Sequence, residues 1–194
     1  MTERTADVVF MRERANGHAG AVFWLTGLSG AGKSTLAFGA ERVLRAMGYQ
    51  TYVLDGDRLR RGLNRDLGFS EADRMENMRR VGEVASLLAD AGMVTIVALI
   101  SPLREGREEA RRLVSSNSPF HEVYVAADLA TCEARDPKGL YRKAHAGELT
   151  AFTGISSPYE VPATPDLVID TVVRPPRPAI DELVAYIRGK VGRP

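Results

Sequence analysis

A glycine-rich segment between an apolar run and a helical pattern constrains this chain more than any other feature. Residues 27–34 read Gly-Leu-Ser-Gly-Ala-Gly-Lys-Ser and match G-x-x-x-x-G-K-[ST] at every fixed position. Apolar residues 21–25 precede the segment, and a pattern with one apolar face, from Leu36 to Met47, follows it. A loop in this setting turns successive backbone N–H groups toward one point, and the start of the helix adds partial positive charge there. The sequence therefore predicts a phosphate-binding loop between a strand and a helix.

The loop motif predicts a site for ATP or GTP. Lys33 is expected to reach the β- and γ-phosphates, and the Ser34 hydroxyl is expected to bind Mg²⁺. The alternative is a glycine-rich turn that binds nothing, and the flanking strand and helix patterns argue against it. The loop residues expected to surround the phosphates are Gly27, Leu28, Ser29, Gly30, Ala31, Gly32, Lys33 and Ser34.

Apolar runs alternate with amphipathic stretches along the rest of the chain, which is typical of parallel α/β folds. Strands are expected at about residues 21–26, 51–54, 93–100, 122–126 and 167–169, with helices between them and a last helix over about 178–191. A length of 194 residues fits one domain. The sequence thus predicts a single domain over residues 21–194, in which a five-stranded parallel sheet carries helices on both faces. Residues 1–20 are expected to form an N-terminal arm, either disordered or engaged in an oligomer contact.

Composition excludes several classes of protein. The net charge is +1, so no overall field attracts nucleic acid or a membrane surface. The single cysteine, Cys132, excludes an intramolecular disulfide framework and suits a reducing cytoplasm. No apolar run approaches the ~18 residues that span a bilayer. We therefore expect a cytoplasmic protein with a small-molecule substrate and neither nucleic-acid nor membrane partners.

Residues 136–166 do not follow the alternation of strands and helices. The segment contains several glycines and prolines, scattered charges and isolated aromatic residues. Long irregular connections in compact domains are often functional lids, and phosphoryl transfer needs water to be kept from the reacting phosphate. The segment is therefore expected to be a lid, with a short helix at about residues 140–146.

Two carboxylates follow the second predicted strand. Asp55 and Asp57 flank a glycine there, and ligands of open parallel sheets bind outside the carboxyl ends of the strands. One carboxylate is expected to assist Mg²⁺ and the other to accept a proton from an attacking hydroxyl. The alternative for Asp57 is a helix cap.

The helix predicted to begin after Ser70 has a buried face that becomes polar at its start. Its apolar stripe, read backward by helical steps from Val81, reaches Asn77 and Arg74. Buried polar groups need hydrogen-bond partners, so either acidic side chains or a ligand must pair with Asn77 and Arg74. The alternative is that this end of the helix is exposed to solvent. With Arg60 close upstream, an anionic second substrate is expected here.

Ser101 and Pro102 follow the third strand. Serine at the cap position and proline at the first helical position are common at the start of a helix, and that role alone explains why the two residues occur together. The position at a strand's carboxyl end nevertheless places the Ser101 hydroxyl at the edge of the expected site.

These segments, in this order, resemble the adenylyl-sulfate kinases, ATP-dependent enzymes that phosphorylate the 3′-hydroxyl of adenosine 5′-phosphosulfate in sulfate assimilation. The resemblance runs from about residue 17 to residue 170 and implies the three-layer P-loop NTPase fold. A phosphate loop alone is shared by many unrelated activities, whereas this series is specific. The matching segments are residues 26–35, 54–57, 62–69, 73–80, 100–102, 132–141, 152–155 and 157–160.

The resemblance implies roles on the substrate side. Arg60, Arg74 and Asn77 would hold the phosphosulfate, and Phe69 and Phe152 would enclose its adenine. The remaining implied contacts with this substrate come from Ile100, Ser101, Lys138 of the lid and Leu140.

It also implies roles on the ATP side and in the reaction. Arg135 would pack on the adenine of ATP, and Thr35 would join the phosphate loop. Asp57 would be the base and Asp55 would assist Mg²⁺, although these two roles could be exchanged. Ser101 would lie beside the transferred phosphate, and its counterpart is a phosphorylation site in some members. The family is commonly dimeric, so a homodimer is implied, and an ATP sulfurylase is a possible partner.

The chain departs from the usual family pattern at four positions. Arg58 and Arg61 stand where Asn and His are usual, and His145 and Ala151 replace an Arg and an Asn of the lid. Arg58 in place of Asn casts doubt on the side-chain contact that the family would make from position 58. The two lid changes are expected to alter the affinity for the substrates but not the reaction.

Two other functions are compatible with the phosphate loop. A kinase for gluconate, shikimate or a nucleoside monophosphate would not need the two adenine-binding aromatics or the Arg74 and Asn77 pair. A non-catalytic regulatory module would be expected to lose Lys33, Ser34 or an aspartate, yet all are present.

Overall fold

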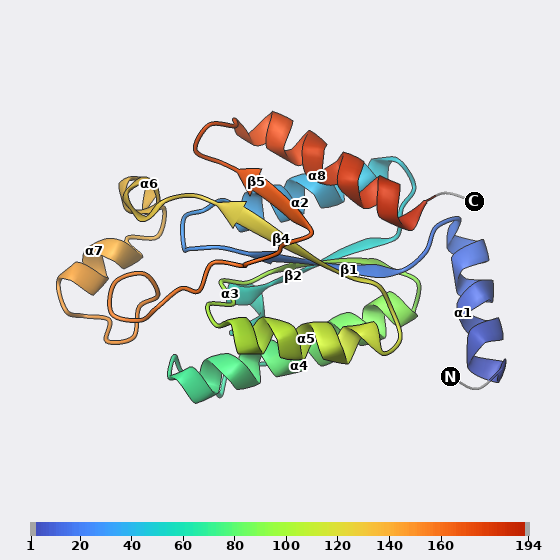
Figure 1. The fold of residues 1–194 in the computed structure, drawn as a ribbon, viewed down its shortest axis with the longest axis horizontal. Coiled ribbons are helices and arrows are strands. Elements are labelled where there is room, and N and C mark those ends of the chain that lie inside the picture. The colour runs from blue at the N-terminus through green and yellow to red at the C-terminus, as the bar shows by residue number, and fades with distance from the viewer. Residues whose placement is uncertain (1–2, 193–194) are drawn as a thin grey trace.

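Five parallel strands form one sheet in the order β2-β3-β1-β4-β5 (Figure 1). The structure is a computed structural model that describes residues 3–192. Each neighbouring pair of strands is parallel, so the predicted five-stranded parallel sheet is confirmed, with β1 at its centre. The strands are β1 (Ala21–Thr26), β2 (Thr51–Asp55), β3 (Val94–Ala98), β4 (Phe120–Ala126) and β5 (Leu167–Asp170).

Helices cover both faces of the sheet, as predicted. Helices α2 (Lys33–Ala46) and α8 (Pro176–Val191) lie on one face, and α4 (Glu71–Asp90) and α5 (Arg104–Ser115) lie on the other (Figure 1). The shorter helices are α3 (Gly56–Leu59), α6 (Leu129–Arg135) and α7 (Leu140–His145).

The central strand supplies both hydrophobic cores because successive side chains of a strand point to opposite faces. Phe23 and Leu25 join the core beneath α2 and α8. Val22 and Trp24 join the core beneath α4 and α5. Burial on both faces explains why this strand reads as an uninterrupted apolar run.

The carboxyl ends of the strands meet at one edge of the sheet. The connections after β1, β2 and β3 leave from this edge, and α6 and α7 extend beyond the end of β4 (Figure 1). This placement brings the predicted phosphate loop, the two aspartates and the lid to the same end of the molecule.

The lid is anchored to the body of the domain by aromatic residues. Tyr141 of α7 and Phe152 are both buried, and their rings meet edge to face with centroids 5.0 Å apart. Both belong to the core beneath α2 and α8. Residues 146–166 contain no helix or strand beyond an isolated bridge between Thr153 and Ser157.

The N-terminal arm contains helix α1 (Glu3–Asn16), at the end of the molecule opposite α6 and α7 (Figure 1). Arg12 Nη1 donates to a carboxylate oxygen of Asp90 at 2.6 Å, and Asn16 Nδ2 donates to the carbonyl of Gly92 at 3.0 Å. The arm is thus a helix attached to the end of α4, while residues 1 and 2 lie outside the described part. No helix within residues 3–192 is long and apolar enough to span a membrane.

Gly20 packs closely against the backbone at the end of α4. An ideal β-carbon at this position would lie 2.0 Å from the carbonyl oxygen of Ala89, and that oxygen belongs to rigid backbone. We expect Gly20→Ala to lower the free energy of unfolding by about 1–3 kcal/mol, the usual range for overpacking. Thermal unfolding followed by circular dichroism measures this.

Gly189 in α8 is the matched control because it is exposed and a β-carbon there would meet nothing within 4 Å. Alanine at this helical position should raise stability by up to about 1 kcal/mol. Equal unfolding midpoints for Gly20→Ala and Gly189→Ala would contradict the described packing.

Candidate active site

The phosphate loop connects β1 to α2 and closely approaches its neighbours. Gly27 has φ 155°, and a β-carbon there would lie 2.6 Å from the carbonyl oxygen of Val125. Gly30 has φ 79°, and a β-carbon would lie 2.9 Å from the carbonyl oxygen of Cys132. Both positions therefore require glycine, which gives a local physical reason for the motif.

Lys33 begins α2 and folds back over the loop. Its Nζ donates to the carbonyl oxygens of Gly27 at 2.8 Å and Leu28 at 2.7 Å. Burial lowers the pKa of Lys33 to about 8, and the nearby charge of Lys138 acts in the same direction. The ammonium group is thus a largely desolvated cation whose hydrogen-bond partners are neutral carbonyls, an arrangement that favours an anionic ligand.

Ser34 and Asp55 join the phosphate loop to the end of β2. Ser34 Oγ donates to Asp55 Oδ2 at 2.7 Å. Asp55 Oδ1 accepts from the backbone N–H groups of Asp57 at 3.2 Å and Arg58 at 3.3 Å, so this residue caps α3. The alternative role of Asp57 as the helix cap is therefore wrong.

The paired oxygens of Ser34 and Asp55 are suitable ligands for Mg²⁺. A hydroxyl and a carboxylate offer the hard oxygen donors that this ion prefers. No group of three or more His, Cys, Asp or Glu side chains able to hold a metal occurs within residues 3–192. A magnesium ion here would therefore take its remaining ligands from phosphate oxygens and water.

Asp57 faces the lid across the edge of the sheet. Its carboxylate forms an ion pair with Lys138, which lies between α6 and α7. The Asp57 side chain is 54% exposed, in contrast to the buried Asp55. Asp57 is thus the carboxylate more accessible to a ligand.

Two arginines and an exposed aromatic ring gather at the start of α4. The guanidinium carbon of Arg60 lies 4.3 Å from the centroid of the Phe69 ring, and that of Arg74 lies 5.7 Å from it. Arg74 also donates to the carbonyls of Phe69, at 3.0 Å, and Ala151 of the lid. Burial lowers the pKa of Arg74, and the adjacent charge of Arg60 lowers it further. Two neighbouring cations of this kind favour an anionic ligand.

The polar end of the buried α4 face, predicted from the sequence, is confirmed. Asn77 is buried, and its Oδ1 accepts from Asn64 Nδ2 at 3.0 Å. Its partner is an amide rather than an acidic side chain. Because Asn77 Oδ1 is occupied by this bond, its amide N–H groups are the donors that remain for a ligand.

Ser101 does not cap a helix, and this part of the sequence prediction is wrong. Helix α5 begins at Arg104, with Leu103 at the cap position. Ser101 instead occupies a turn with φ 47°, and its buried Oγ accepts from Trp24 Nε1 at 2.8 Å. The hydroxyl nevertheless lies at the carboxyl edge of the sheet, beside the strand that leads into the phosphate loop.

The other predicted site residues surround this edge. Arg135 donates to the carbonyls of Gly30 at 3.3 Å and Thr171 at 2.6 Å. The carbonyl of Ile100 accepts from the N–H of Gly27 at 3.4 Å. Leu140 begins α7 and packs against the core beneath α2, and Thr35 is an exposed residue of the first turn of α2.

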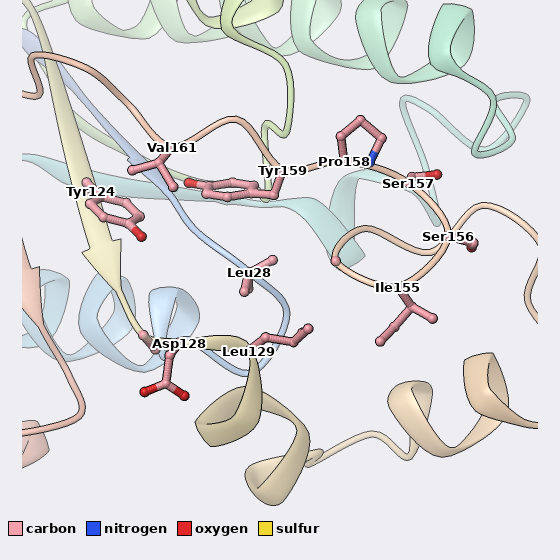
Figure 2. A pocket seen from close by; sticks show the side chains of 12 residues that line it. Leu28, Tyr124, Asp128, Leu129, Ile155, Ser156, Ser157, Pro158, Tyr159 and Val161 are labelled. Carbon is pink, nitrogen blue, oxygen red and sulfur yellow. The ribbon is translucent and has the colours of Figure 1, made fainter.

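A hollow of about 620 Å³ lies on the β4 side of the phosphate loop. Leu28 of the loop, Tyr124 of β4 and Tyr159 of the lid line it, together with Asp128 and Leu129 at the start of α6 (Figure 2). It shares Leu28 with the predicted phosphate site but contains neither Lys33 nor the two aspartates. This hollow is therefore adjacent to the candidate site and does not coincide with it.

Comparison with known proteins identifies the family. The family model described as adenylylsulphate kinase matches residues 19–170. An adenylyl-sulfate kinase of Geotalea daltonii is 55% identical over 177 residues, covering 91% of this chain and 87% of the relative. One from Bacillus licheniformis is 57% identical over 173 residues, covering 89% of this chain and 87% of the relative. A solved structure of the Mycobacterium tuberculosis APS kinase in complex with AMPPNP and APS has 50% identity and a TM-score of 0.85, covering 88% of this chain and 98% of that one.

The chain belongs to the adenylyl-sulfate kinase family. The resemblance inferred from the sequence motifs is thus confirmed, and so is the three-layer P-loop fold. The positions of the individual site residues in this member of the family are those described above.

Two residues with contacts around this site, Thr171 and Arg107, were not predicted from the sequence. Thr171, after β5, donates its hydroxyl to the carbonyl of Ala31 at 2.8 Å and so supports the phosphate loop. No local pattern distinguishes it. Arg107 did carry a signal, because it interrupts the buried stripe of α5 that continues through Ala110 and Val114 at helical spacing.

The lowered pKa of Lys33 predicts proton uptake when ATP binds to this kinase. About half of the Lys33 side chains should be neutral at pH 8, and phosphate oxygens favour the charged form. Binding at pH 8 should therefore take up as much as about half a proton per site. Titration calorimetry in two buffers of different ionisation enthalpy measures this number.

The Lys33→Met variant is the control and should show no such uptake. Proton uptake of equal size in this variant, or none in the unchanged protein, would mean that burial does not shift Lys33 as described.

Proposed function

We propose that this adenylyl-sulfate kinase transfers the γ-phosphoryl group of ATP to the 3′-hydroxyl of adenosine 5′-phosphosulfate. The products would be ADP and 3′-phosphoadenosine 5′-phosphosulfate. The observation that carries this proposal is the position of Asp57, at the edge of the sheet shared by the Lys33 loop and the arginine-rich end of α4. The Lys33 loop would bind the triphosphate of ATP, and the arginines at the start of α4 would bind the anionic acceptor. The Asp57 carboxylate would take the proton of the acceptor hydroxyl.

The ATP side would use the loop N–H groups and Lys33. These donors would neutralise the charge that spreads over the transferring phosphoryl group. Entering phosphate oxygens would replace the carbonyl partners of Lys33, so the ammonium group would exchange weak acceptors for charged ones. Arg135 already contacts the loop at Gly30 and would offer the face of its guanidinium group to the adenine of ATP.

Ser34 and Asp55 would hold Mg²⁺ in this proposal. The ion supplies charge neutralisation between phosphate groups when it is bound. Asp55 suits this role because the Ser34 hydroxyl and two backbone N–H groups already fix its orientation. Asp55 would therefore bind the metal, and Asp57 would act as the base.

The acceptor side would use Arg60, Arg74 and Asn77. The two guanidinium groups would bind the phosphosulfate, and the free amide donors of Asn77 would fix its position. The exposed Phe69 ring would support the adenine on one side, with Phe152 of the lid on the other. Asp57 would accept the proton of the 3′-hydroxyl as its oxygen attacks the γ-phosphorus, and the bond to ADP would break.

Lys138 would change its partner during the reaction. It pairs with Asp57 in the structure, and acceptance of a proton requires that carboxylate to contact the acceptor hydroxyl. Transfer of Lys138 to a substrate phosphate would free Asp57 and close the lid over both substrates.

We also propose a homodimeric, cytoplasmic enzyme of sulfate assimilation. The family resemblance supports the dimer, and the single buried free thiol of Cys132 suits a reducing compartment. An ATP sulfurylase is the natural partner class, because such an enzyme makes the acceptor.

ADP release tests the reaction directly. A coupled assay should give ADP at a rate that depends on both ATP and adenosine 5′-phosphosulfate. Lys33→Ala should lower turnover at least ~100-fold, the magnitude expected when one donor to the transition state is removed. Phosphorylation of gluconate, shikimate or a nucleoside monophosphate with none of the sulfated nucleotide would contradict the proposal, and a Lys33→Ala variant of normal turnover would refute the role of Lys33.

Asp57→Asn should separate base catalysis from magnesium binding. The amide cannot accept the proton, so kcat should fall by about 10²–10⁴-fold at saturating Mg²⁺. Asp66→Asn is the control, since this exposed carboxylate pairs with Arg80 on the outer surface of the domain. Recovery of Asp57→Asn at higher Mg²⁺ concentration would instead assign Asp57 to the metal.

A further inference from the structure

We propose that Arg107 is a positioning residue for phosphoryl transfer. Its side chain holds the Ser101 turn and the C-terminal end of the lid in a single arrangement. The proposal concerns a side chain of α5 that lies outside the implied ligand sets for both substrates. It rests on the proposed function for its kinetic consequence, and its structural consequence can be tested independently.

Arg107 is a charged residue inside the protein. Only 3% of its surface is exposed, and a charge is rarely buried to this extent unless it is paired. Its Nε donates to Glu122 Oε1 of β4 at 2.7 Å. A buried ion pair is often no more stabilising than apolar side chains of the same size, so stability alone is a weak explanation for this one.

The two remaining nitrogens of the guanidinium group reach two functional segments. Nη1 donates to the carbonyl oxygen of Ser101 at 2.7 Å, and Nη2 donates to the carbonyl oxygen of Glu160 at 2.8 Å. Ser101 follows β3, whereas Glu160 lies at the end of the lid. A planar guanidinium group can serve three acceptors in three directions at once, whereas the ammonium group of a lysine cannot reproduce this fork.

The Ser101 turn has a backbone conformation that requires support. Ser101, with φ 47°, is the one non-glycine residue in the described part of the chain whose φ lies in the left-handed region. Such conformations persist where surrounding contacts determine them, and they cluster at functional sites. The short hydrogen bonds that support it come from Arg107 at the carbonyl and from Trp24 at the side chain, and Thr26 Oγ1 makes a longer one to the same carbonyl at 3.4 Å.

The contact with Trp24 also fixes what the Ser101 hydroxyl can do. The indole N–H is only a donor, so Ser101 Oγ must be the acceptor in this bond. The hydroxyl proton of Ser101 therefore remains available for another acceptor. An oxygen of the transferring phosphoryl group fits this requirement, provided that the turn keeps its orientation.

The end of the lid is attached to the same place. The N–H of Glu160 donates to the carbonyl of Pro102 at 2.8 Å, and its carboxylate accepts from the N–H of Arg104 at the start of α5. Tyr159 forms a hydrogen bond with Thr26 Oγ1 at 3.0 Å, and its ring stacks on Tyr124 with centroids 6.3 Å apart (Figure 2). Because Arg107 binds the carbonyls of both segments, displacement of the lid end would also disturb the Ser101 turn.

Two variants of Arg107 test this arrangement. Arg107→Lys keeps a positive charge beside Glu122 but loses the three-way fork. Arg107→Met combined with Glu122→Gln removes both charges, so no unpaired carboxylate remains buried. Arg112→Met is the control on the exposed face of α5, because Arg112 pairs with Glu109 of the same helix rather than with Glu122, the Ser101 turn or the lid.

The single tryptophan of the chain reports on the turn without any assay of activity. Trp24 is the only tryptophan, and its indole N–H is bonded to Ser101, so its fluorescence follows that contact. Ser101→Ala gives the reference emission for the broken hydrogen bond. We expect both Arg107 variants to shift toward that reference and Arg112→Met to keep the emission of the unchanged protein.

The kinetic constants should separate the Arg107 variants from the control in the same way. Both Arg107 variants should lower kcat at least ~10-fold while KM for ATP stays within about 3-fold, because the ATP loop is untouched. Unchanged emission and kcat in a folded Arg107 variant would overturn the proposal. So would an unfolding midpoint below the assay temperature in both variants, since Arg107 would then serve stability alone. If the unchanged protein lacks activity with adenosine 5′-phosphosulfate, the proposed function fails, whereas the emission shifts still decide the role of Arg107.

Discussion

The site depends on a buried cation whose partners are neutral. Lys33 lies against carbonyl oxygens of its own loop, in surroundings that disfavour its charge, and the two glycines that shape the loop allow no side chain. The loop keeps this arrangement because β1 is central and buried on both faces. Ser34, which follows Lys33, donates a hydrogen bond to Asp55. Asp55 caps α3 and thereby positions Asp57. The proposed base is therefore positioned through the phosphate loop.

Three polar contacts, among others, attach the expected lid to residues of the proposed site. Lys138 pairs with Asp57, the carbonyl of Ala151 accepts from Arg74, and the carbonyl of Glu160 accepts from Arg107. Each contact joins the lid to a different strand end or helix start. In the proposed reaction, a segment held in this way would exclude water from the reacting phosphate.

Patterns within one element were predictable from the sequence. The five strands, the loop motif and the polar end of α4 each depend on periodicity or spacing, and the structure confirms them. Partners across the sheet were not predictable in this way. Ser101 bonds Trp24 instead of capping α5, because that outcome depends on which strands become neighbours. The cap of α3 by Asp55 rather than Asp57 is local, but it depends on the exact residue at which β2 ends, which periodicity does not fix. Arg107 lies between these cases, since its place on an apolar stripe was visible but its partners were not.

The central claim is that both substrates meet above the carboxyl edge of the sheet, between the Lys33 loop and the start of α4. A crystal structure with a non-hydrolysable ATP analogue and adenosine 5′-phosphosulfate tests this most directly. The account predicts the phosphosulfate against Arg60, Arg74 and Asn77, with its 3′-hydroxyl between Asp57 and the γ-phosphate. Density for the sulfated nucleotide elsewhere, for example in the hollow lined by Tyr124 and Tyr159, would contradict it.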